Sequence, residues 1–188
     1  PWLNKWRDAK IPQESTAAVE LRNGWQCVIL LTLQKGVSLE ADLDNVISES
    51  DSDWLWLIRL HREQGRERDS IEEHYRSLRS TGVNVRDATT LPLYELMSVA
   101  DVHVTGYSTC ALEALAFGLA SVLVHPSGKH AFENYLERGV MFYASGKGNI
   151  LAAIRKGLAA DGRQCRAAAP FASPERAPQT MRNILRSR

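Results

Sequence analysis

Short apolar runs that alternate with amphipathic segments constrain most strongly what this chain can fold into. The clearest runs are residues 25–34, WQCVILLTLQ, and residues 53–61, DWLWLIRLH. Each run is nearly continuous in apolar side chains and is long enough for one strand, which is typical of a strand buried on both faces. Between them, residues 38–50 carry apolar side chains three or four positions apart, as on one face of a helix. The order strand, helix, strand indicates a βαβ unit.

The same alternation continues along the chain. Strands are predicted at residues 25–34, 53–61, 83–85, 101–105, 120–124 and 140–143. Helices are predicted at residues 38–50, 66–80, 91–100, 108–117, 131–138 and 147–160. Strands separated by helices form a parallel sheet with right-handed crossovers and helices on both faces. We therefore predict an α/β fold with a doubly wound, mostly parallel, six-stranded Rossmann-like sheet in the order 3-2-1-4-5-6.

Length and local composition suggest how the chain is divided. The 188 residues suffice for one well-buried α/β domain and are few for two. Residues 1–24 are polar and irregular, so we interpret them as a linker; residues 25–160 form the Rossmann-like domain, and residues 161–188 a tail with an Arg-rich terminal helix. The chain begins at Pro1 without a Met. We therefore expect it to be a piece of a longer protein.

Charge and cysteine content exclude several classes of protein. The formal net charge of +1 gives no electrostatic footprint for nucleic acid. The three cysteines, Cys27, Cys110 and Cys165, lack metal-type spacing, and their odd number argues against a disulfide framework. No apolar run approaches the roughly 20 residues of a membrane span. We expect a cytoplasmic protein with no membrane span, no bound metal and no nucleic-acid partner.

The strand order predicts where a ligand binds. In doubly wound sheets, ligands lie beyond the carboxyl ends of the strands at the point where the order reverses, which here means the loops after the first and fourth strands. The second of these loops reads Gly106, Tyr107, Ser108, Thr109 before a helix. A glycine lets an anion approach the backbone, and a helix start offers N–H groups and the positive end of its dipole. The loop is therefore a candidate phosphate cradle; the alternative is an ordinary serine N-cap after a glycine turn.

Glu113 is the candidate for binding a ribose. It lies four residues after Thr109 and so shares a helix face with it, beside the apolar stripe of that helix. A carboxylate at the helix flank can accept hydrogen bonds from both ribose hydroxyls when the phosphates lie at the helix start. The alternative is a solvated surface charge.

Other candidates end neighbouring strands. Lys35, in the first loop, can neutralise charge that develops on a diphosphate leaving group. His61 and His125 close the second and fifth strands at the same sheet edge, although a histidine at a strand end is more often a structural hydrogen-bonding group. Residues 88–94, with Pro92 fixing the start of a helix, form a candidate wall for a nucleobase.

Several familiar motifs are missing from the sequence. No GxGxxG follows the first strand, and neither a P-loop lysine nor a Gly-x-Ser-x-Gly elbow occurs. NAD-dependent oxidoreductases, P-loop ATPases and α/β-hydrolases are therefore excluded. Paired carboxylates of the glycosidase type are not evident either.

Residues 91–118, LPLYELMSVADVHVTGYSTCALEALAFG, carry a resemblance to a known family. They resemble the C-terminal domain of GT-B glycosyltransferases, especially enzymes of bacterial surface and capsular polysaccharide synthesis, in which an "aDv-it" strand leads into a Gly/Asp-Tyr-Ser-Ser/Thr turn and then "alEA-a-G". The resemblance is strong over this segment and extends to residues 25–160 in general layout.

The resemblance implies that residues 25–160 bind a nucleotide-activated sugar, the donor substrate. It implies that Gly106, Ser108 and Thr109 hold the donor phosphates, that Glu113 binds the ribose, and that Lys35 and Gly36 lie on the diphosphate side. The predicted donor-binding set is Gly36, Leu93, Gly106, Tyr107, Ser108, Thr109 and Glu113, and the predicted catalytic residues are Lys35 and His61. His61 resembles the histidine of a His-Pro motif in capsule sialyl- and Kdo-transferases, although Arg62 stands here in place of the proline.

In that family the acceptor site lies on an N-terminal domain. The resemblance therefore implies a glycan acceptor bound by a domain outside this chain, no cofactor beyond the donor, and donor binding with little turnover by this half alone. Peripheral membrane association of the full-length protein stays open. Two alternatives stay open too: a UDP-sugar 2-epimerase or polyol-phosphate transferase on the same fold, and a non-catalytic nucleotide-binding module.

Overall fold

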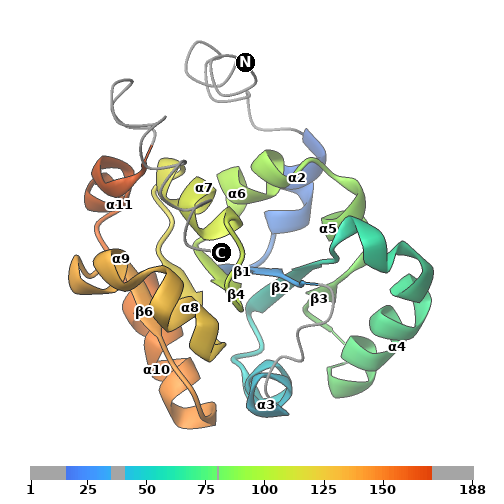
Figure 1. The fold of residues 1–188 in the computed structure, drawn as a ribbon. Helices are drawn as coiled ribbons and strands as arrows, with labels where there is room; N and C mark the ends of the chain where they lie inside the picture. The colour runs from blue at the N-terminus through green and yellow to red at the C-terminus, as the bar shows by residue number, and fades with distance from the viewer. Residues whose placement is uncertain (1–15, 35–40, 80, 171–188) are drawn as a thin grey trace.

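Parallel strands in the order β3-β2-β1-β4-β5-β6 form the sheet of this protein (Figure 1). The structure is a computed structural model and describes residues 16–34, 41–79 and 81–170. The strands are β1 (Cys27–Thr32), β2 (Trp54–Arg59), β3 (Val83–Asn84), β4 (Val102–Thr105), β5 (Ser121–Leu123) and β6 (Met141–Tyr143). Each neighbouring pair is parallel. The predicted fold class and strand order are confirmed.

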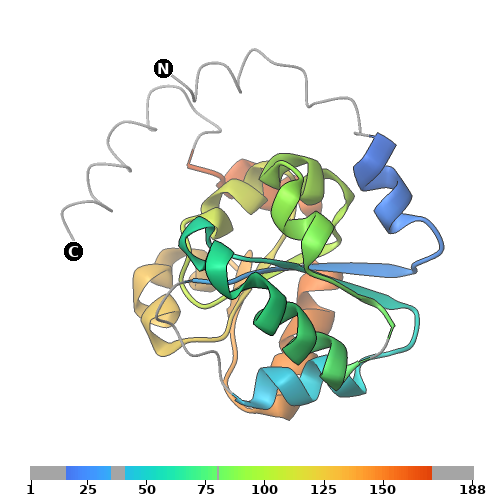
Figure 2. The same cartoon turned by 90° about the vertical axis from the view of Figure 1, so that its right-hand side faces the viewer.

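Helices cover both faces of the sheet, as the edge-on view in Figure 2 shows. One face carries α3 (Ala41–Glu49), α4 (Arg68–Leu78) and α10 (Lys147–Leu158). The opposite face carries α2 (Thr16–Arg22), α5 (Arg86–Thr90), α6 (Leu93–Val99), α7 (Cys110–Ala116) and α11 (Gly162–Ala168). The remaining elements are the 3-10 helix η1 (Arg62–Glu67), α8 (Pro126–Ala131) and α9 (Glu133–Glu137). None of the helices in these described ranges is long and apolar enough to span a membrane.

Strand β1 explains why the sequence shows continuous apolar runs. Its six residues are all buried. Because successive side chains of a strand point to opposite faces, Ile29 and Leu31 pack toward α3 and α10, whereas Val28 and Leu30 pack toward α6 and α7. Burying each such side chain contributes roughly 1.5–3 kcal/mol relative to leaving it in water. A central strand covered on both sides therefore has no face for polar residues.

The N-terminal segment differs from its prediction. Residues 1–24 were predicted to be irregular, but Thr16–Arg22 forms helix α2. Ala18 is fully buried in the cluster beside α6. The Arg22 guanidinium donates two hydrogen bonds of 2.9 Å to the Asp101 carboxylate, just before β4. The helix was missed because its anchors are Ala18, the partly buried Leu21 and an ion pair, too few apolar residues to give a hydrophobic period in the sequence.

The C-terminal part of the core also extends further than predicted. Residues 161–188 were interpreted as a tail, yet α11 packs against α7 and buries Cys165 and Ala168. Gly118 turns the chain after α7 with a φ of +83°, a conformation that favours glycine. The predicted helix at residues 131–138 corresponds to α9, Glu133–Glu137, whereas the preceding helix α8, Pro126–Ala131, was not predicted. The predicted Arg-rich terminal helix lies outside the described residues.

Candidate functional site

The carboxyl ends of β1 and β4 lie side by side, at the point where the strand order reverses. Thr32 of β1 pairs with Thr105 of β4. The Thr105 hydroxyl donates to the Thr32 carbonyl oxygen at 3.0 Å. Beyond the strands, the backbone N–H of Tyr107 donates to the Gln34 side-chain oxygen at 2.8 Å. The two loops that were predicted to share a site are therefore in contact.

The glycine turn after β4 leads directly into α7. Gly106 is buried, Tyr107 and Ser108 are half-buried, and Thr109 is exposed. The Ser108 hydroxyl accepts a hydrogen bond from the backbone N–H of Cys110 at 3.3 Å. Ser108 thus satisfies one N–H at the helix start, although the N-cap position is Thr109, whose side chain makes no capping hydrogen bond. The four predicted residues follow β4 directly, at the carboxyl edge of the sheet, and their binding of an anion stays a prediction.

Helix α8 fixes the turn from the other side. A Cβ atom on Gly128 would lie 2.4 Å from the Gly106 carbonyl oxygen, so only glycine permits this approach of the two backbones. His125 caps α8 by accepting a hydrogen bond from the Ser127 N–H at 3.2 Å. Its imidazole centroid is 5.2 Å from the Tyr107 ring. Gly128 was not predicted, because helix α8 was not predicted either and the approach of two backbones leaves no local signal in the sequence.

Glu113 lies on α7 one turn beyond the glycine turn, at the predicted flank. Its carboxylate is half-buried and accepts a hydrogen bond from the Tyr94 hydroxyl of α6. Burial raises the pKa of Glu113 above its ordinary value, and the hydrogen bond from Tyr94 acts against that rise. Burial and the neighbouring carboxylate raise the pKa of Tyr94. The Glu113 carboxylate is therefore partly shielded from solvent and is not a fully solvated surface charge.

Arg59, at the end of β2, forms hydrogen bonds with the backbone of residues 88–94. The Arg59 guanidinium donates to the carbonyl oxygens of Ala88 at 2.9 Å and Leu91 at 2.5 Å. Burial lowers the pKa of Arg59. Residues 88–94 were predicted to form a loop, which is wrong for residues 88–90, because α5 extends to Thr90. Leu93 begins α6 and is half-buried against the cluster formed with α7.

The remaining predicted residues lie around the same edge or outside the described residues. His61 is exposed and precedes η1 as its N-cap. Its Nδ1 accepts a hydrogen bond from the backbone N–H of Glu63 at 3.4 Å, and its backbone N–H donates to the Gln64 side-chain oxygen at 3.0 Å. This is the structural role that a strand-end histidine most often has. Lys35 and Gly36 lie outside the described residues, so their predicted roles stay predictions.

A row of buried polar side chains beneath the site was missed. His103 of β4 is fully buried, and its two ring nitrogens lie 2.9 Å from the hydroxyls of Thr32 and Ser121. Burial lowers the pKa of His103 to about 3, so the ring is neutral at pH 7. The row joins β1, β4 and β5, the three strands that lead into the loops of the site. Polar residues within doubly buried strands were the signal, because buried polar groups must bond one another.

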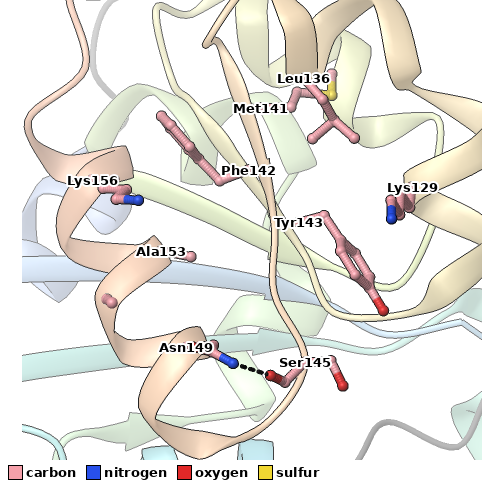
Figure 3. Close-up of a pocket in the computed structure, with 10 residues that line it drawn as sticks. Lys129, Leu136, Met141, Phe142, Tyr143, Ser145, Asn149, Ala153 and Lys156 are labelled. Carbon is pink, nitrogen blue, oxygen red and sulfur yellow. Dashed lines mark hydrogen bonds between the residues drawn. The ribbon is translucent and has the colours of Figure 1, made fainter.

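A separate pocket of about 570 Å³ lies along the edge strand β6 (Figure 3). Met141 and Phe142 give it an apolar lining, while Lys129 of α8 and Lys156 of α10 enter from opposite sides of β6. Two strands, β5 and β4, separate β6 from β1 in the sheet. The pocket therefore lies at the edge of the sheet, whereas the predicted site lies at its centre, beyond β1 and β4. Within the described part of the chain, no group of three or more His, Cys, Asp or Glu residues is arranged to hold a metal ion.

Comparison with solved structures gives the same fold. No protein-family model matches the chain, and no curated protein sequence matches it. The UDP-GlcNAc 2-epimerase from Neisseria meningitidis, bound to UDP-GlcNAc, is 15% identical with a TM-score of 0.65, over 99% of this chain and 51% of the epimerase. The glycosyltransferase of kitacinnamycin is 20% identical with a TM-score of 0.55, over 86% of this chain and 44% of that enzyme.

A third similar structure is the wall teichoic acid polymerase TagF soaked with CDPG. It is 18% identical with a TM-score of 0.55, over 80% of this chain and 39% of the polymerase. The chain thus spans about half the length of these proteins or less. At such identities the likeness shows the fold: a Rossmann-like α/β unit of the kind that forms one half of GT-B glycosyltransferases and UDP-GlcNAc 2-epimerases.

Proposed function

We propose that this chain is the donor-binding half of a glycosyltransferase that uses a nucleotide-activated sugar. One observation carries the proposal. The glycine turn at residues 106–109 and the half-buried carboxylate of Glu113 lie together at the carboxyl ends of β1 and β4, where the strand order reverses.

In this proposal the diphosphate of the donor lies at the turn. Gly106 has no side chain and so lets a phosphate approach the backbone. Ser108 and Thr109 add hydroxyl groups, and the start of α7 adds the positive end of a helix dipole. Glu113 lies one helical turn further along, about 5.4 Å, which matches the step from a phosphate to a ribose. Tyr107 lines the turn on the side of His125.

The rest of the donor extends to both sides of the turn. Leu93 and the backbone pinned by Arg59 form the wall for the nucleobase. Lys35 and Gly36 approach the diphosphate, where an ammonium group stabilises the leaving phosphate as charge develops on it. His61, at the same edge of the sheet, contacts a donor phosphate. The site needs no metal or organic cofactor in this proposal.

The second half of the reaction belongs to a domain outside this chain. A glycan of a surface polysaccharide is the proposed acceptor, and the N-terminal half supplies its site and the catalytic base. Isolated, this chain binds the donor without appreciable turnover. The three cysteines are free thiols, which fits a reducing cytoplasm.

A UDP-sugar 2-epimerase is the second candidate, because an epimerase bound to UDP-GlcNAc matches the chain over 99% of its residues. The two candidates share the nucleotide site and differ in the groups that face the sugar. An epimerase needs an acid and a base at the sugar ring. His61 and His125 each use their Nδ1 atom to cap a helix in the described structure, so neither ring offers that nitrogen as the acid or base of an epimerase, whereas the glycosyltransferase role asks of His61 only a contact to a donor phosphate.

Calorimetric titration with UDP, CDP, CMP, GDP and dTDP tests the proposed function. We expect one base to bind at least tenfold more tightly than the others. Ser108→Ala is expected to weaken that binding about tenfold, since a hydrogen bond to a charged group contributes roughly 1.5–3 kcal/mol. Ser77→Ala, an exposed serine on α4, is the matched control and should bind as the wild type does. Failure of the wild type to bind any of the five nucleotides would rule out the proposed function.

A further inference from the structure

The pocket along β6 has the size and the lining of a small-molecule site (Figure 3). Its volume of about 570 Å³ lies within the usual range of such sites, about 300–1,000 Å³. Helices α9 and α10 and strand β6 supply its apolar lining, through Leu136, Met141, Phe142, Ala152 and Ala153. Leu136 and Phe142 are half-buried, so part of their apolar surface is open to a ligand.

Two lysines give this pocket a positive charge. Lys129 belongs to α8 and Lys156 to α10, and their ammonium groups lie on opposite sides of β6 (Figure 3). The described residues that line the pocket include no aspartate or glutamate. Lys147, also on α10, differs because it forms an ion pair with Glu49. An anion in the pocket would therefore meet two ammonium groups and no opposing carboxylate from these lining residues.

Contacts within the protein position the polar groups of the pocket. The Lys129 ammonium lies 5.7 Å from the centroid of the Tyr143 ring, which is a cation–π distance. This contact leaves the N–H groups of the ammonium able to donate to an anion. The Asn149 side chain donates to the Ser145 carbonyl oxygen at 2.8 Å, which joins α10 to the chain just after β6. Lys129 and the end of the pocket beside Asn149 are therefore arranged before a ligand arrives.

Charge distinguishes the candidate occupants of the pocket. Residues 171–188 of this chain carry four arginines and one glutamate, so the two lysines would repel this segment. A second copy of the chain that covered the same face would bring lysines against lysines. The exposed large apolar side chain among the described residues is Val19, on α2, which does not line the pocket and so offers no anchor for a membrane there. A separate small anion with an apolar body matches both the lining and the charge.

We propose that the β6 pocket binds an elongated organic dianion, whose apolar body lies against Phe142 and whose two acidic groups bond Lys129 and Lys156. The acidic groups are carboxylates or phosphates at the two ends of an apolar body. A monoanion would satisfy one ammonium, and a neutral ligand neither. The inference does not depend on the proposed function, because β6 lies at the edge of the sheet and the donor site at its centre.

Chemical-shift titration of the isotopically labelled chain with straight-chain dicarboxylates, from hexanedioate to dodecanedioate, tests the proposal. One length should bind best, because the carboxylates must span the two lysines, and its dissociation constant should be about 1 mM or below, as is usual for a ligand of this size. The amide shifts should gather at Phe142, Tyr143 and Asn149. The monocarboxylate and the diol of the same length are controls and should bind about threefold and about tenfold more weakly, since each exposed ion pair contributes little by itself.

Substitutions in the pocket test the role of each charge. Lys129→Gln and Lys156→Gln should each weaken binding of the best dicarboxylate about threefold and remove its advantage over the monocarboxylate. Ala152→Glu, at an exposed position of the lining, places a carboxylate four residues before Lys156 and should weaken binding about tenfold. Arg155→Gln, exposed on α10 beside Lys156 but outside the lining, is the matched control and should bind as the wild type does.

The outcomes that would overturn the proposal are separate from nucleotide binding at residues 106–109. Absence of shifts at β6 with every dicarboxylate, at about ten times the expected dissociation constant, would overturn it. Equal binding of the dicarboxylate, the monocarboxylate and the diol would do the same, as would wild-type binding in both lysine variants. Co-sedimentation with phosphatidylglycerol vesicles that is lost in both lysine variants, without dicarboxylate binding, would assign the lysines to a membrane surface instead.

Discussion

Replacing His103 by leucine is expected to lower the free energy of unfolding by about 3 kcal/mol at pH 7. Leucine fills much of the space of the imidazole, but it leaves the buried hydroxyls of Thr32 and Ser121 without their partner. Each unsatisfied buried polar group costs about 1–3 kcal/mol. A domain of this kind has only about 5–15 kcal/mol of stability, so the loss is a large fraction of the total. Urea unfolding followed by circular dichroism measures it.

The same residue is expected to make the protein acid-sensitive. The pKa of His103 is about 3 in the folded protein and 6.5 is its ordinary value, so below pH 6.5 the unfolded chain takes up a proton that the folded chain refuses. Stability due to this ring is therefore complete above pH 6.5 and is lost as pH falls toward 3, at up to about 1.4 kcal/mol per pH unit. His103→Leu should remove that slope between pH 6 and pH 4.

An exposed histidine provides the control for both measurements. His130→Leu, on α8, should change neither the free energy of unfolding at pH 7 nor the dependence of that free energy on pH appreciably. A cost below 1 kcal/mol for His103→Leu, or an unchanged slope, would mean that the polar row does not stabilise the sheet beneath the site.

Glu113→Ala is expected to weaken binding of the preferred ribonucleoside diphosphate about thirtyfold. The variant loses two charge-assisted hydrogen bonds to the ribose, each contributing roughly 1.5–3 kcal/mol before water compensates part of the loss. Glu113→Gln keeps the shape and one acceptor, so its loss should be smaller and its affinity should no longer fall toward acid pH. Calorimetry at pH 5, 6, 7 and 8 measures both effects.

Glu73→Ala, an exposed glutamate on α4, is the matched control and should bind normally. If Glu113→Ala retained wild-type affinity while the nucleotide still bound, Glu113 would not be the ribose-binding residue.

The parts of the fold that could be predicted are those with a local signal. Strand β1 is buried on both faces, so its sequence had to be apolar throughout, and the strand order followed from the handedness of successive crossovers. Helices α2 and α11 were missed because their fully buried residues, Ala18, Cys165 and Ala168, are small. Small residues become buried only through the partners that the folded chain provides.

The site divides in the same way. Gly106, Ser108 and Glu113 could be placed because they are close in sequence, on one turn and the helix that follows it. Gly128 and Tyr94 contact them from separate helices, and nothing local to those residues indicates the contact. Such pairings are set by how α6 and α8 pack beside the crevice, which the hydrophobic pattern does not specify.

Chemical-shift mapping of the isotopically labelled protein with the best-binding nucleotide tests the central claim most directly. The account predicts that the largest amide shifts occur at Leu93, Gly106, Ser108 and Glu113, at the carboxyl ends of β1 and β4. Shifts gathered instead along the β6 pocket, at Phe142 and Asn149, would contradict it.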